Sequence, residues 1–417
     1  MANNPVNNIV DSKINNTIWK NNIFVRVYLS TFISNLGDRL VVFILPLWVM
    51  SITKSSFLVS ILNAVLLLTT VLLTPFTGTM ADRFPRRILM IYADILRFFV
   101  MFTLVIIIDY NFSFYLLLFL LILRSIGTSL SAPAANAAIV TFVKKNHLEE
   151  AVALRQTMIQ IVTIGAPLLG GALVGIINYK GIFIIDTLTF LISIIILCSL
   201  KFPKDIAIKN KRNFFDDMKD GINLLFNNNL LKVLLISAAI INVLGSSLFL
   251  CLQVFVVRDM NLSNYWWGIV FSSSPIGVII GSFFSRKIKI NREILSSSFI
   301  FIFIVGFFNI LMGLTLNPWL FSLLYFCSGF AFGVSNVYFG VLYRKIIPND
   351  KQGRFFGLLN SILLISAPIG ITLTGLILET LKSSILIIII GAITSLTSIL
   401  TYIFIRKKEK LEIKFND

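Results

Sequence analysis

The chain has 417 residues, of which 57% are hydrophobic and 13% charged, and its mean hydropathy is +0.90. A soluble domain is roughly 45–50% apolar and about 25% charged. A water-soluble protein is therefore excluded, and so is a disordered chain, which would be poor in hydrophobic residues. The 36 basic and 19 acidic residues give a net charge of +17. The cysteines Cys198, Cys251 and Cys327 all lie in apolar stretches, which argues against a disulfide framework or a metal site.

About twelve apolar stretches are long enough to cross a bilayer, which takes about 20 residues per helix. The segment before them, Met1–Asn22, is polar and rich in asparagine, and no small-residue cleavage site follows the first stretch. We therefore expect the first span to be retained. The predicted spans are centred near Val41, Leu67, Phe102, Leu123, Pro167, Ile192, Leu244, Ile276, Phe303, Phe326, Leu364 and Ile390. The sequence thus predicts an all-α integral membrane protein.

The basic residues predict the orientation of these spans. With the N-terminus placed in the cytoplasm, most of the 36 Lys and Arg residues fall at cytoplasmic ends of spans. Those at the outer ends are Lys54, Lys180, Arg258 and Lys382. This asymmetry follows the positive-inside rule and predicts that both termini are cytoplasmic. Because the charge is explained by topology in the lipid bilayer, no nucleic-acid partner is predicted.

Segments of the first half recur in the second at an offset of about 200 residues, as in transporters built from duplicated bundles. The matching pairs are Ile33–Leu40 with Ile241–Leu248, Gly78–Arg83 with Gly281–Arg286, and Ala166–Gly170 with Ala367–Gly370. We predict two six-helix halves, residues 1–201 and 230–417. The connecting segment 202–229 carries apolar residues at helical spacing, which predicts an amphipathic helix on the cytoplasmic face. The alternative for this segment is a plain linker.

Two charged residues, Asp38 and Arg39, interrupt the first span about 18 Å of helix beyond Arg26. Charge near the middle of a membrane is costly and marks a functional site by default. A nearby cation lowers the pKa of a carboxyl group and desolvation raises it, so a carboxylate in a cavity that opens and closes is able to exchange a proton. We predict that both residues serve proton coupling or line the cavity. The alternative is a static buried salt bridge.

The loop after the second span reads Gly78-Thr-Met-Ala-Asp82-Arg83-Phe-Pro-Arg86-Arg87. It resembles the loop motif of the major facilitator superfamily, with methionine and proline at two positions that usually hold leucine and glycine. The resemblance implies a gating element in which the aspartate and the arginines pair with neighbouring helices in one state and release them in the other. The alternative is a short cytoplasmic loop that simply collects arginines.

Further charges lie in the third and fourth spans. Asp94 and Arg97 are spaced i, i+3 and are predicted to pair with each other or with the loop, in a structural role. Arg124, followed by Gly127, resembles the arginine motif that the same superfamily carries in its fourth span. The resemblance implies that the first and fourth spans line a central cavity, which brings Arg124 within reach of Asp38 and its neighbour Arg39.

The fifth span contains Gly165-Ala166-Pro167-Leu-Leu-Gly170-Gly171. It is similar to the Gly-Pro-x-x-Gly-Gly motif of exporters in this superfamily, with alanine in place of the first glycine. The small residues permit close helix packing and Pro167 bends the helix, which suits a hinge or seal between the halves. The alternative is the general abundance of Gly and Pro in membrane helices. In the sixth span we expect Asp186 to be solvated at the outer interface, so we do not predict it as a proton carrier.

The second half is less charged than the first. Ser246 and Ser247 occupy the positions of Asp38 and Arg39, and Phe326 that of Arg124, so we assign the second half to the substrate. Polar uncharged residues within spans are candidates for the substrate cavity or for contacts between helices. These residues are Asn35, Asn63, Asn136, Gln160, Asn242, Gln253, Asn309, Asn336 and Asn360.

Together these motifs cover essentially the whole chain, which resembles the major facilitator superfamily and, within it, the macrolide-efflux group of bacterial exporters. The resemblance implies a monomeric transporter of the bacterial cytoplasmic membrane that expels a bulky amphiphilic small molecule, such as a macrolide, in exchange for protons by alternating access. Alternative cargoes are a siderophore or a lysophospholipid. An integral-membrane enzyme or a non-transporting receptor is a remote alternative. The sequence has no phosphate-binding loop, zinc motif or cluster of His and Cys, so no enzymatic activity, cofactor or metal is predicted.

Overall fold

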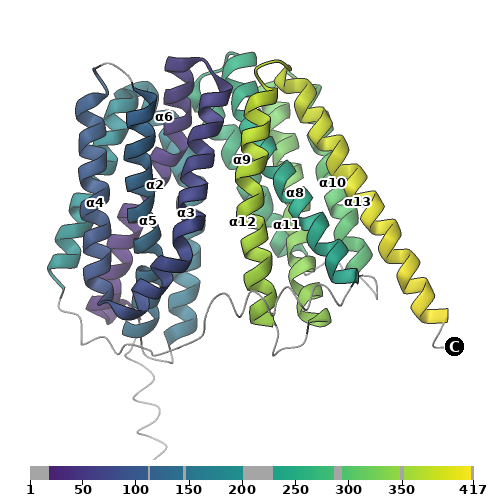
Figure 1. Cartoon of the computed structure of the whole chain (residues 1–417), viewed down its shortest axis with the longest axis horizontal. Coiled ribbons are helices and arrows are strands. Elements are labelled where there is room, and N and C mark those ends of the chain that lie inside the picture. The colour runs from purple at the N-terminus through teal and green to yellow at the C-terminus, as the bar shows by residue number, and fades with distance from the viewer. Residues whose placement is uncertain are drawn as a thin grey trace, which may run out of the picture. The chain divides into compact units, whose positions relative to one another are not determined.

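The structure is a computed structural model, and it describes residues 18–110, 113–143, 147–200, 229–285, 294–347 and 352–414. These residues form helices joined by short connections, and no strand occurs among them. In Figure 1 the long helices run up and down the page. Residues 202–228 of the segment predicted as an amphipathic helix lie outside the described residues.

The first half begins with a short turn and continues as long helices. The elements are η1 (Ile18–Lys20), α2 (Asn22–Thr53), α3 (Ser56–Arg83), α4 (Arg86–Ile107), α5 (Phe114–Phe142) and α6 (Leu148–Cys198). The backbone of α6 is non-helical at Asn178, where φ is 58° and ψ is 179°. With ψ near 180° this conformation lies outside the left-handed helical region and is one that residues other than glycine rarely adopt. This break divides α6 into two segments, each long enough to span, which correspond to the predicted fifth and sixth spans.

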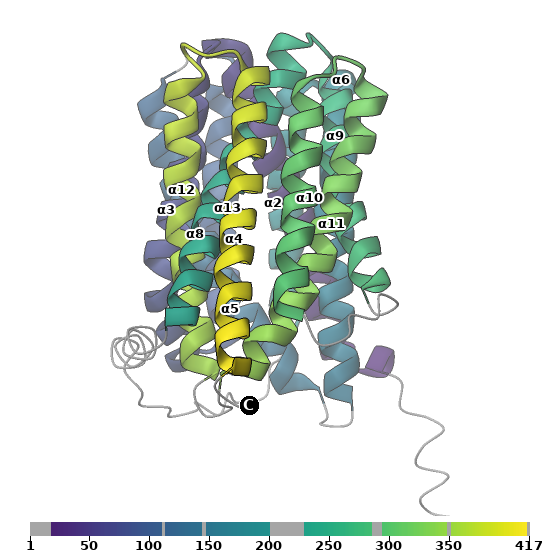
Figure 2. The ribbon, with the colours of Figure 1, turned by 90° about the vertical axis from the view of Figure 1, so that its right-hand side faces the viewer.

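The second half consists of helices separated by short turns. The elements are α8 (Asn229–Val254), η3 (Phe255–Asp259), α9 (Asn264–Phe284), α10 (Ile294–Gly313), α11 (Pro318–Ile346), α12 (Gln352–Ile377) and α13 (Ser383–Lys414). In Figure 2, α8 lies between α12 and α13, and α10 lies beside α11. Among the described residues, ten helices are long and apolar enough to cross a membrane, and α10 adds the shorter apolar segment Ser297–Gly313. With α6 counted as two spans, the predicted all-α membrane fold of about twelve spans is confirmed.

Turn residues explain where several helices begin and end. Asn317 caps α11, because its Oδ1 accepts hydrogen bonds of 3.0 and 3.2 Å from the backbone N–H groups of Trp319 and Leu320, and Pro318 follows it at the first helical position. The non-glycine residues with positive φ among those described are Lys54, Asn178 and Asn261. All of them lie in turns at the predicted outer end of the helices.

Glycines bring α9 and α11 together. A Cβ at Gly277 or Gly281 would collide with the backbone at Phe326 or Phe330, and one at Gly329 or Gly333 would collide with the α9 backbone. Each helix therefore carries two glycines one turn apart that face the partner helix, as in small-xxx-small packing of membrane helices. Any larger side chain at these positions would push the two helices apart.

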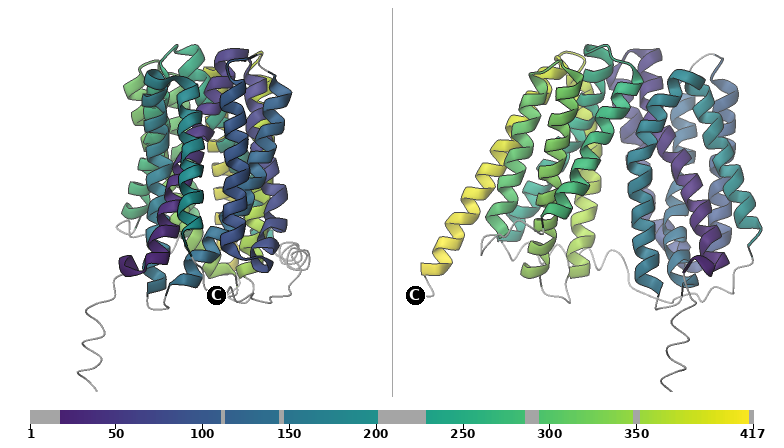
Figure 3. Two further views of the ribbon diagram at one scale, coloured as in Figure 1. Left: turned by 90° about the vertical axis from the view of Figure 1, so that its left-hand side faces the viewer. Right: turned by 180° about the vertical axis from the view of Figure 1, so that it is seen from behind.

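The described residues form two compact units. The first unit consists of three segments: the described residues up to Arg39, Leu73–Val162, and the residues from Phe183 to 200. The second takes Leu40–Leu72, Thr163–Ile182 and the described residues of the second half. The second unit thus includes the parts of α2, α3 and α6 that adjoin the turns at Lys54 and Asn178. Figure 3 shows the same helices from two further sides. The predicted division into halves 1–201 and 230–417 rests on the repeat and stays a prediction.

Candidate functional site

Five ionisable side chains meet inside the first unit, and we call them the charge cluster. They are Asp38 from α2, Asp94 and Arg97 from α4, Arg124 from α5 and Asp186 from α6. Nη1 of Arg97 lies 2.6 Å from Oδ2 of Asp38, and its Nη2 pairs with Asp94. Nη2 of Arg124 lies 2.8 Å from Oδ1 of Asp38 and 3.2 Å from Oδ2 of Asp186. Asp38 is therefore the carboxylate that both arginines share.

The charge cluster is almost completely withdrawn from solvent. The side chains of Asp94 and Asp186 are 3% and 0% exposed, and that of Asp38 is 10% exposed. Charges buried to this extent persist only when they are paired, because removing an ion from water costs several kcal/mol. Among the three carboxylates, Asp38 has the most contact with solvent.

The charges of the cluster do not balance. Three carboxylates face two guanidinium groups, so the cluster carries one net negative charge when every group is ionised. Protonation of one carboxyl group makes it neutral. If that group is Asp38, the pairs Arg97 with Asp94 and Arg124 with Asp186 both remain. A proton on Asp94 or on Asp186 likewise leaves each arginine one carboxylate, so the cluster can hold one proton without leaving a buried charge unpaired.

One face of α6 supports the cluster through residues spaced three to four apart. Ser193 Oγ donates a 2.5 Å hydrogen bond to Oδ2 of Asp94, and Thr189 Oγ1 donates a 2.7 Å bond to the carbonyl of Asp186. The guanidinium carbon of Arg97 lies 4.5 Å from the centre of the Phe190 ring, which is cation–π geometry. These contacts fix the orientation of the charged groups in the cluster.

Gly127 lets α5 approach α4 beside the cluster. A Cβ at Gly127 would lie 2.7 Å from Cγ of Arg97 and 2.9 Å from the carbonyl oxygen of Ala93, both closer than ordinary packing allows. Gly127 follows Arg124 by about one helical turn. The arginine supplies the charge, and the glycine supplies the space that the neighbouring Arg97 needs.

The structure corrects three expectations about charged residues. Arg39 is exposed and has no ion pair or hydrogen bond among the described residues, because the residue after Asp38 points about 100° further round the helix. Asp186 is not solvated at the outer interface but is fully buried against Arg124. Asp94 and Arg97 pair as expected, but Arg97 also binds Asp38, so this pair belongs to the cluster. The sequence carried one signal for these pairings, because a charged residue inside a membrane requires a partner of opposite charge.

The loop motif is described only in part. Gly78 lies within α3, and the side chains of Asp82 and Arg83 lie outside the described part of the structure. Arg86, the first residue of α4, is buried. Arg87 donates hydrogen bonds of 2.9 and 2.8 Å to the carbonyls of Leu197 and Cys198, which caps the C-terminus of α6. Arg87 thus braces one helix end, and the gating role of the motif stays a prediction.

The exporter motif lies where α6 packs on α9, inside the second unit. A Cβ at Gly171 would lie 2.7 Å from the carbonyl oxygen of Asn264, and one at Gly268 would lie 2.6 Å from that of Pro167. Gly170 faces Phe43, Ile44 and Leu40 of α2. A Cβ at Gly165, in contrast, would meet nothing within 4 Å. Gly170 and Gly171 therefore allow α6 to pack closely on its neighbours, and Gly165 takes no part in this packing.

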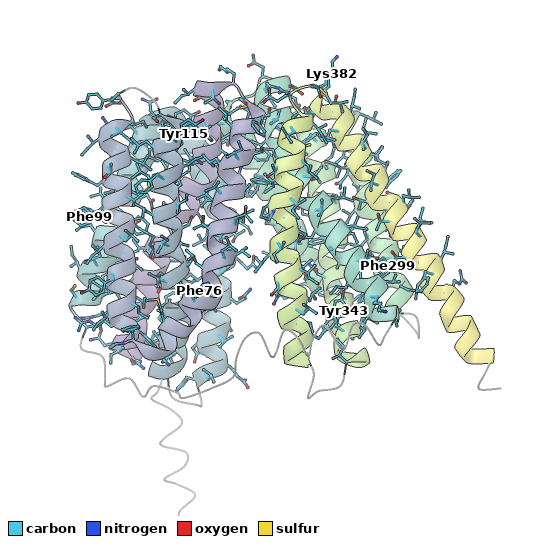
Figure 4. The ribbon with its side chains drawn as sticks, in the orientation of Figure 1. Phe76, Phe99, Tyr115, Phe299, Tyr343 and Lys382 are labelled. Atoms are coloured by element: carbon cyan, nitrogen blue, oxygen red, sulfur yellow. The ribbon has the colours of Figure 1, made fainter. Side chains whose placement is uncertain are left out.

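Polar contacts also join the start of α3 to the second half of the chain. We call them the outer contact. Oε1 of Glu379, in the turn after α12, accepts hydrogen bonds of 2.9 Å from Ser55 Oγ and from the backbone N–H of Phe57, at the start of α3. Nη1 of Arg258 donates a 3.2 Å bond to Ser56 Oγ. Lys382 marks the turn of Glu379 in Figure 4. The outer contact is polar and lies at helix ends.

A cavity of about 540 Å³ lies inside the second unit, and we call it the second-half cavity. Residues of α8 to α13 line it, among them Asn242, Asn309 and Asn336, and no charged side chain does so among the described residues. The aromatic residues Phe299 and Tyr343 of its lining are labelled in Figure 4. Its volume is within the range of about 300–1,000 Å³ that is usual for ligand sites.

The predicted polar cavity residues separate into two groups. Asn242 and Asn336 line the second-half cavity. The others do not: Asn63 is buried and donates to the Val59 carbonyl, Gln253 is buried without a hydrogen bond among the described residues, Asn136 is exposed and Asn35 is half-buried. Sequence reasoning could not separate them, because the face on which a polar residue lies depends on helix packing.

Comparison with known proteins agrees with this architecture. The family model of the Major Facilitator Superfamily matches residues 27–371. The chain belongs to the major facilitator superfamily. Within this family it is 24% identical over 397 residues to the uncharacterized transporter YfiS of Bacillus subtilis, covering 90% of this chain and 91% of that protein. It is 26% identical to macrolide efflux protein A of Streptococcus pyogenes over 72% of this chain and 76% of that protein.

Solved structures of bacterial transporter homologues share the fold at low identity. A bacterial homologue of the iron transporter ferroportin, in an inward-facing state, superimposes with a TM-score of 0.70 at 15% identity, over 93% of this chain and all of that one. A bacterial homologue of the human lysosomal transporter Spinster gives a TM-score of 0.69 at 14% identity, over 92% of this chain and 94% of that one. These structures show the fold, and membership of the superfamily together with the membrane-spanning helices makes the chain a multi-pass membrane transporter.

Proposed function

We propose that this transporter exports a bulky amphiphilic small molecule across the bacterial cytoplasmic membrane in exchange for protons, by alternating access. The observation that carries the proposal is the buried charge cluster with one carboxylate more than it has guanidinium groups. A static structural network has no need of the extra carboxylate, which costs free energy when ionised in a buried site. A site that binds and releases a proton in each cycle needs it.

Asp38 is the proposed proton-binding group. It touches both Arg97 and Arg124, and it is the most solvent-accessible carboxylate of the cluster. When Asp38 is protonated, each arginine keeps its own carboxylate. When Asp38 is ionised, the arginines are shared among three carboxylates, which favours a different side-chain arrangement. Proton binding at Asp38 would therefore bias the equilibrium between two conformations, which is what coupling requires.

The proposed cargo is macrolide-like. The support is the 26% identity to macrolide efflux protein A and the exporter motif, whose Gly171 packs against α9. Export would require the outer contact and the Gly171 contact to separate, so that the cargo leaves on the side that holds Glu379. A siderophore or a lysophospholipid remains the alternative cargo, and the transport assay below separates them by substituting each compound for the macrolide.

Reconstituted vesicles test the coupling. The protein is placed in proteoliposomes, a radiolabelled macrolide is added outside, and uptake is measured with and without an imposed proton gradient and with a protonophore. We expect accumulation that depends on the gradient and disappears with the protonophore. Accumulation that is indifferent to both would overturn proton coupling, and absence of any movement would overturn macrolide transport.

The variants Asp38→Asn and Arg39→Gln form a matched pair, since they are adjacent in α2 but only Asp38 belongs to the cluster. We expect Asp38→Asn to lose accumulation driven by the gradient while it retains exchange of labelled for unlabelled substrate. We expect Arg39→Gln to retain both. Loss of accumulation in both variants to the same extent would contradict the assignment of the proton to Asp38.

A further inference from the structure

We infer that the second-half cavity binds an uncharged amphiphile that carries hydrogen-bond acceptors, and that it discriminates against lipophilic cations. The inference deepens the proposed function, on which it rests for the transport of that ligand: a basic cargo such as a macrolide with an amino sugar would enter this cavity with its amine unprotonated. Its test measures binding alone. It names a site and a substrate class from the residues that line the cavity.

The lining excludes a cation. About 540 Å³ of space is surrounded by residues of six helices, and none of the described lining residues is charged. A cation that enters such a site leaves water without gaining a carboxylate partner, and burial of an unpaired charge is strongly unfavourable. An uncharged ligand carries no such cost.

The lining provides a hydrogen-bond donor that has no protein partner. Asn309 of α10 is only 2% exposed, and its Oδ1 accepts a 3.0 Å hydrogen bond from Ser328 Oγ. Its Nδ2 has no hydrogen-bond partner among the described residues. Asn336 of α11 also lines the cavity and has no hydrogen bond to the described residues. An amide NH₂ group donates hydrogen bonds, so these residues fit a ligand with carbonyl, ether or hydroxyl oxygens.

The remaining lining fits an apolar body. Phe299, Phe332, Phe339 and Tyr343 contribute aromatic surface, and aliphatic residues supply most of the rest. Burial of apolar surface stabilises a ligand by about 25 cal/mol per Å². The combination of aromatic walls, amide donors and no charge therefore defines an uncharged, acceptor-bearing amphiphile.

Three probes of similar shape separate the contributions of charge and acceptor. Triphenylphosphine oxide is uncharged with a strong acceptor, triphenylmethane is uncharged without one, and tetraphenylphosphonium is a cation. Binding is measured by equilibrium dialysis with the full chain in lipid nanodiscs, and empty nanodiscs give the partition into lipid. We expect the oxide to bind about 3- to 10-fold more tightly than triphenylmethane, as for one hydrogen bond, and at least about 10-fold more tightly than the phosphonium.

Two variants test whether the probes bind in this cavity. A Cβ at Gly245, which lines the cavity, would meet nothing within 4 Å, so Gly245→Leu should fill the space without a clash and abolish binding of the oxide. Gly340→Leu is its control, since Gly340 also has open space around its Cβ but does not line the cavity. Asn309→Leu should reduce affinity for the oxide to that for triphenylmethane.

A change of specificity gives the strongest test. Asn309→Asp places a carboxyl group in the cavity, and we expect phosphonium binding to increase about 10-fold or more as the pH is raised and this group ionises. Asn317→Asp adds the same charge at the N-cap of α11, outside the cavity, and should leave phosphonium binding unchanged. Variants are compared only when their thermal unfolding matches that of the parent protein.

Equal binding of the phosphonium and the oxide by the parent protein would overturn the inference, and so would unchanged oxide binding in Gly245→Leu. The outcome is independent of the transport assay. Selective binding of the oxide without gradient-driven transport would contradict the proposed function alone, whereas proton-coupled macrolide transport with no selectivity among the probes would contradict this inference alone.

Discussion

Nη1 of Arg97 donates a 2.6 Å hydrogen bond to Oδ2 of Asp38, although the two residues are 59 positions apart in the sequence. This bond connects the Asp94–Arg97 pair of α4 to Arg124 through Asp38, and so turns two separate ion pairs into one cluster. Substitution of any one member should therefore change the ion pairs of the others.

Arg97→Gln is expected to be strongly destabilising. It would leave Asp38 and Asp94 buried without their shared counter-charge, and removal of one partner from a buried ion pair typically costs about 3–5 kcal/mol. Thermal and denaturant unfolding in detergent would measure the loss. The double variant Asp94→Asn/Arg97→Gln should recover part of it, because it removes one of the stranded carboxylates. If Arg97→Gln alone were as stable as Arg39→Gln, the ion pairs of Arg97 in the charge cluster would be contradicted.

Gly127→Val is expected to lower stability by about 1–3 kcal/mol, the usual cost of overpacking. Its side chain would meet Arg97 and the carbonyl of Ala93. Gly175→Val is the matched control, since a Cβ at Gly175 would meet nothing within 4 Å and both changes place valine in a helix. The difference between the two melting temperatures isolates the packing effect, and equal melting temperatures would argue against close packing at Gly127.

Gly171→Val and Gly165→Val should differ although both lie in one motif. The first would push α6 away from the backbone of Asn264, whereas the second would enter open space. We therefore expect macrolide transport to be lost in Gly171→Val and retained in Gly165→Val, at equal amounts of protein in the membrane. If Gly165→Val were as inactive as Gly171→Val, the motif would act through something other than this contact.

The outer contact should weaken in acid. The pKa of Glu379 is lowered from its ordinary value, chiefly because the backbone N–H of Phe57 donates a hydrogen bond to its carboxylate, with further contributions from Ser55 and Arg258 against an opposing effect of burial. A carboxyl group whose pKa is lower in the folded protein stabilises it above the ordinary pKa, and that stabilisation is lost as the pH falls through the folded value.

Glu379→Gln tests this pH dependence. We expect it to lower the melting temperature more at about pH 7 than at about pH 3, because the carboxyl group of the parent protein takes up its proton as the pH falls through its lowered pKa. The effect should be small, because Glu379 is exposed and solvent screens its interactions. A melting-temperature difference that is the same at both pH values would show that the carboxylate charge is not what matters.

Much of the fold was predictable because it depends on local properties of the chain. Apolar runs of sufficient length predicted the spans, and the structure has them, including the two that α6 joins through Asn178. The boundaries of α6 were less predictable, since the connection at Asn178 is too short to interrupt the apolar pattern. The helix in 202–229 was predicted from periodicity alone, and residues 202–228 lie outside the described residues.

The site was predictable only in its outline. Asp38 and Arg124 were identified because each is a charge inside an apolar span, but the same argument included Arg39, which takes no part, and set aside Asp186, which does. The sequence places a charge along the helix axis but not around it. A single residue step rotates a side chain by about 100°, which is enough to move it from a buried cluster to an exposed face.

By itself, the sequence determined the membrane class, the number of spans and the positions of charge within them, because hydrophobicity and length act within one helix. Only the tertiary structure decided which charges share a partner and which asparagines line a cavity. Apart from the Asp94–Arg97 pair, the contacts of the charge cluster join residues 59 to 86 positions apart, on helices whose rotation is set by glycines such as Gly127 and by packing. In a bilayer this packing, rather than hydrophobicity, selects helix partners, and so it decided that three carboxylates meet two arginines.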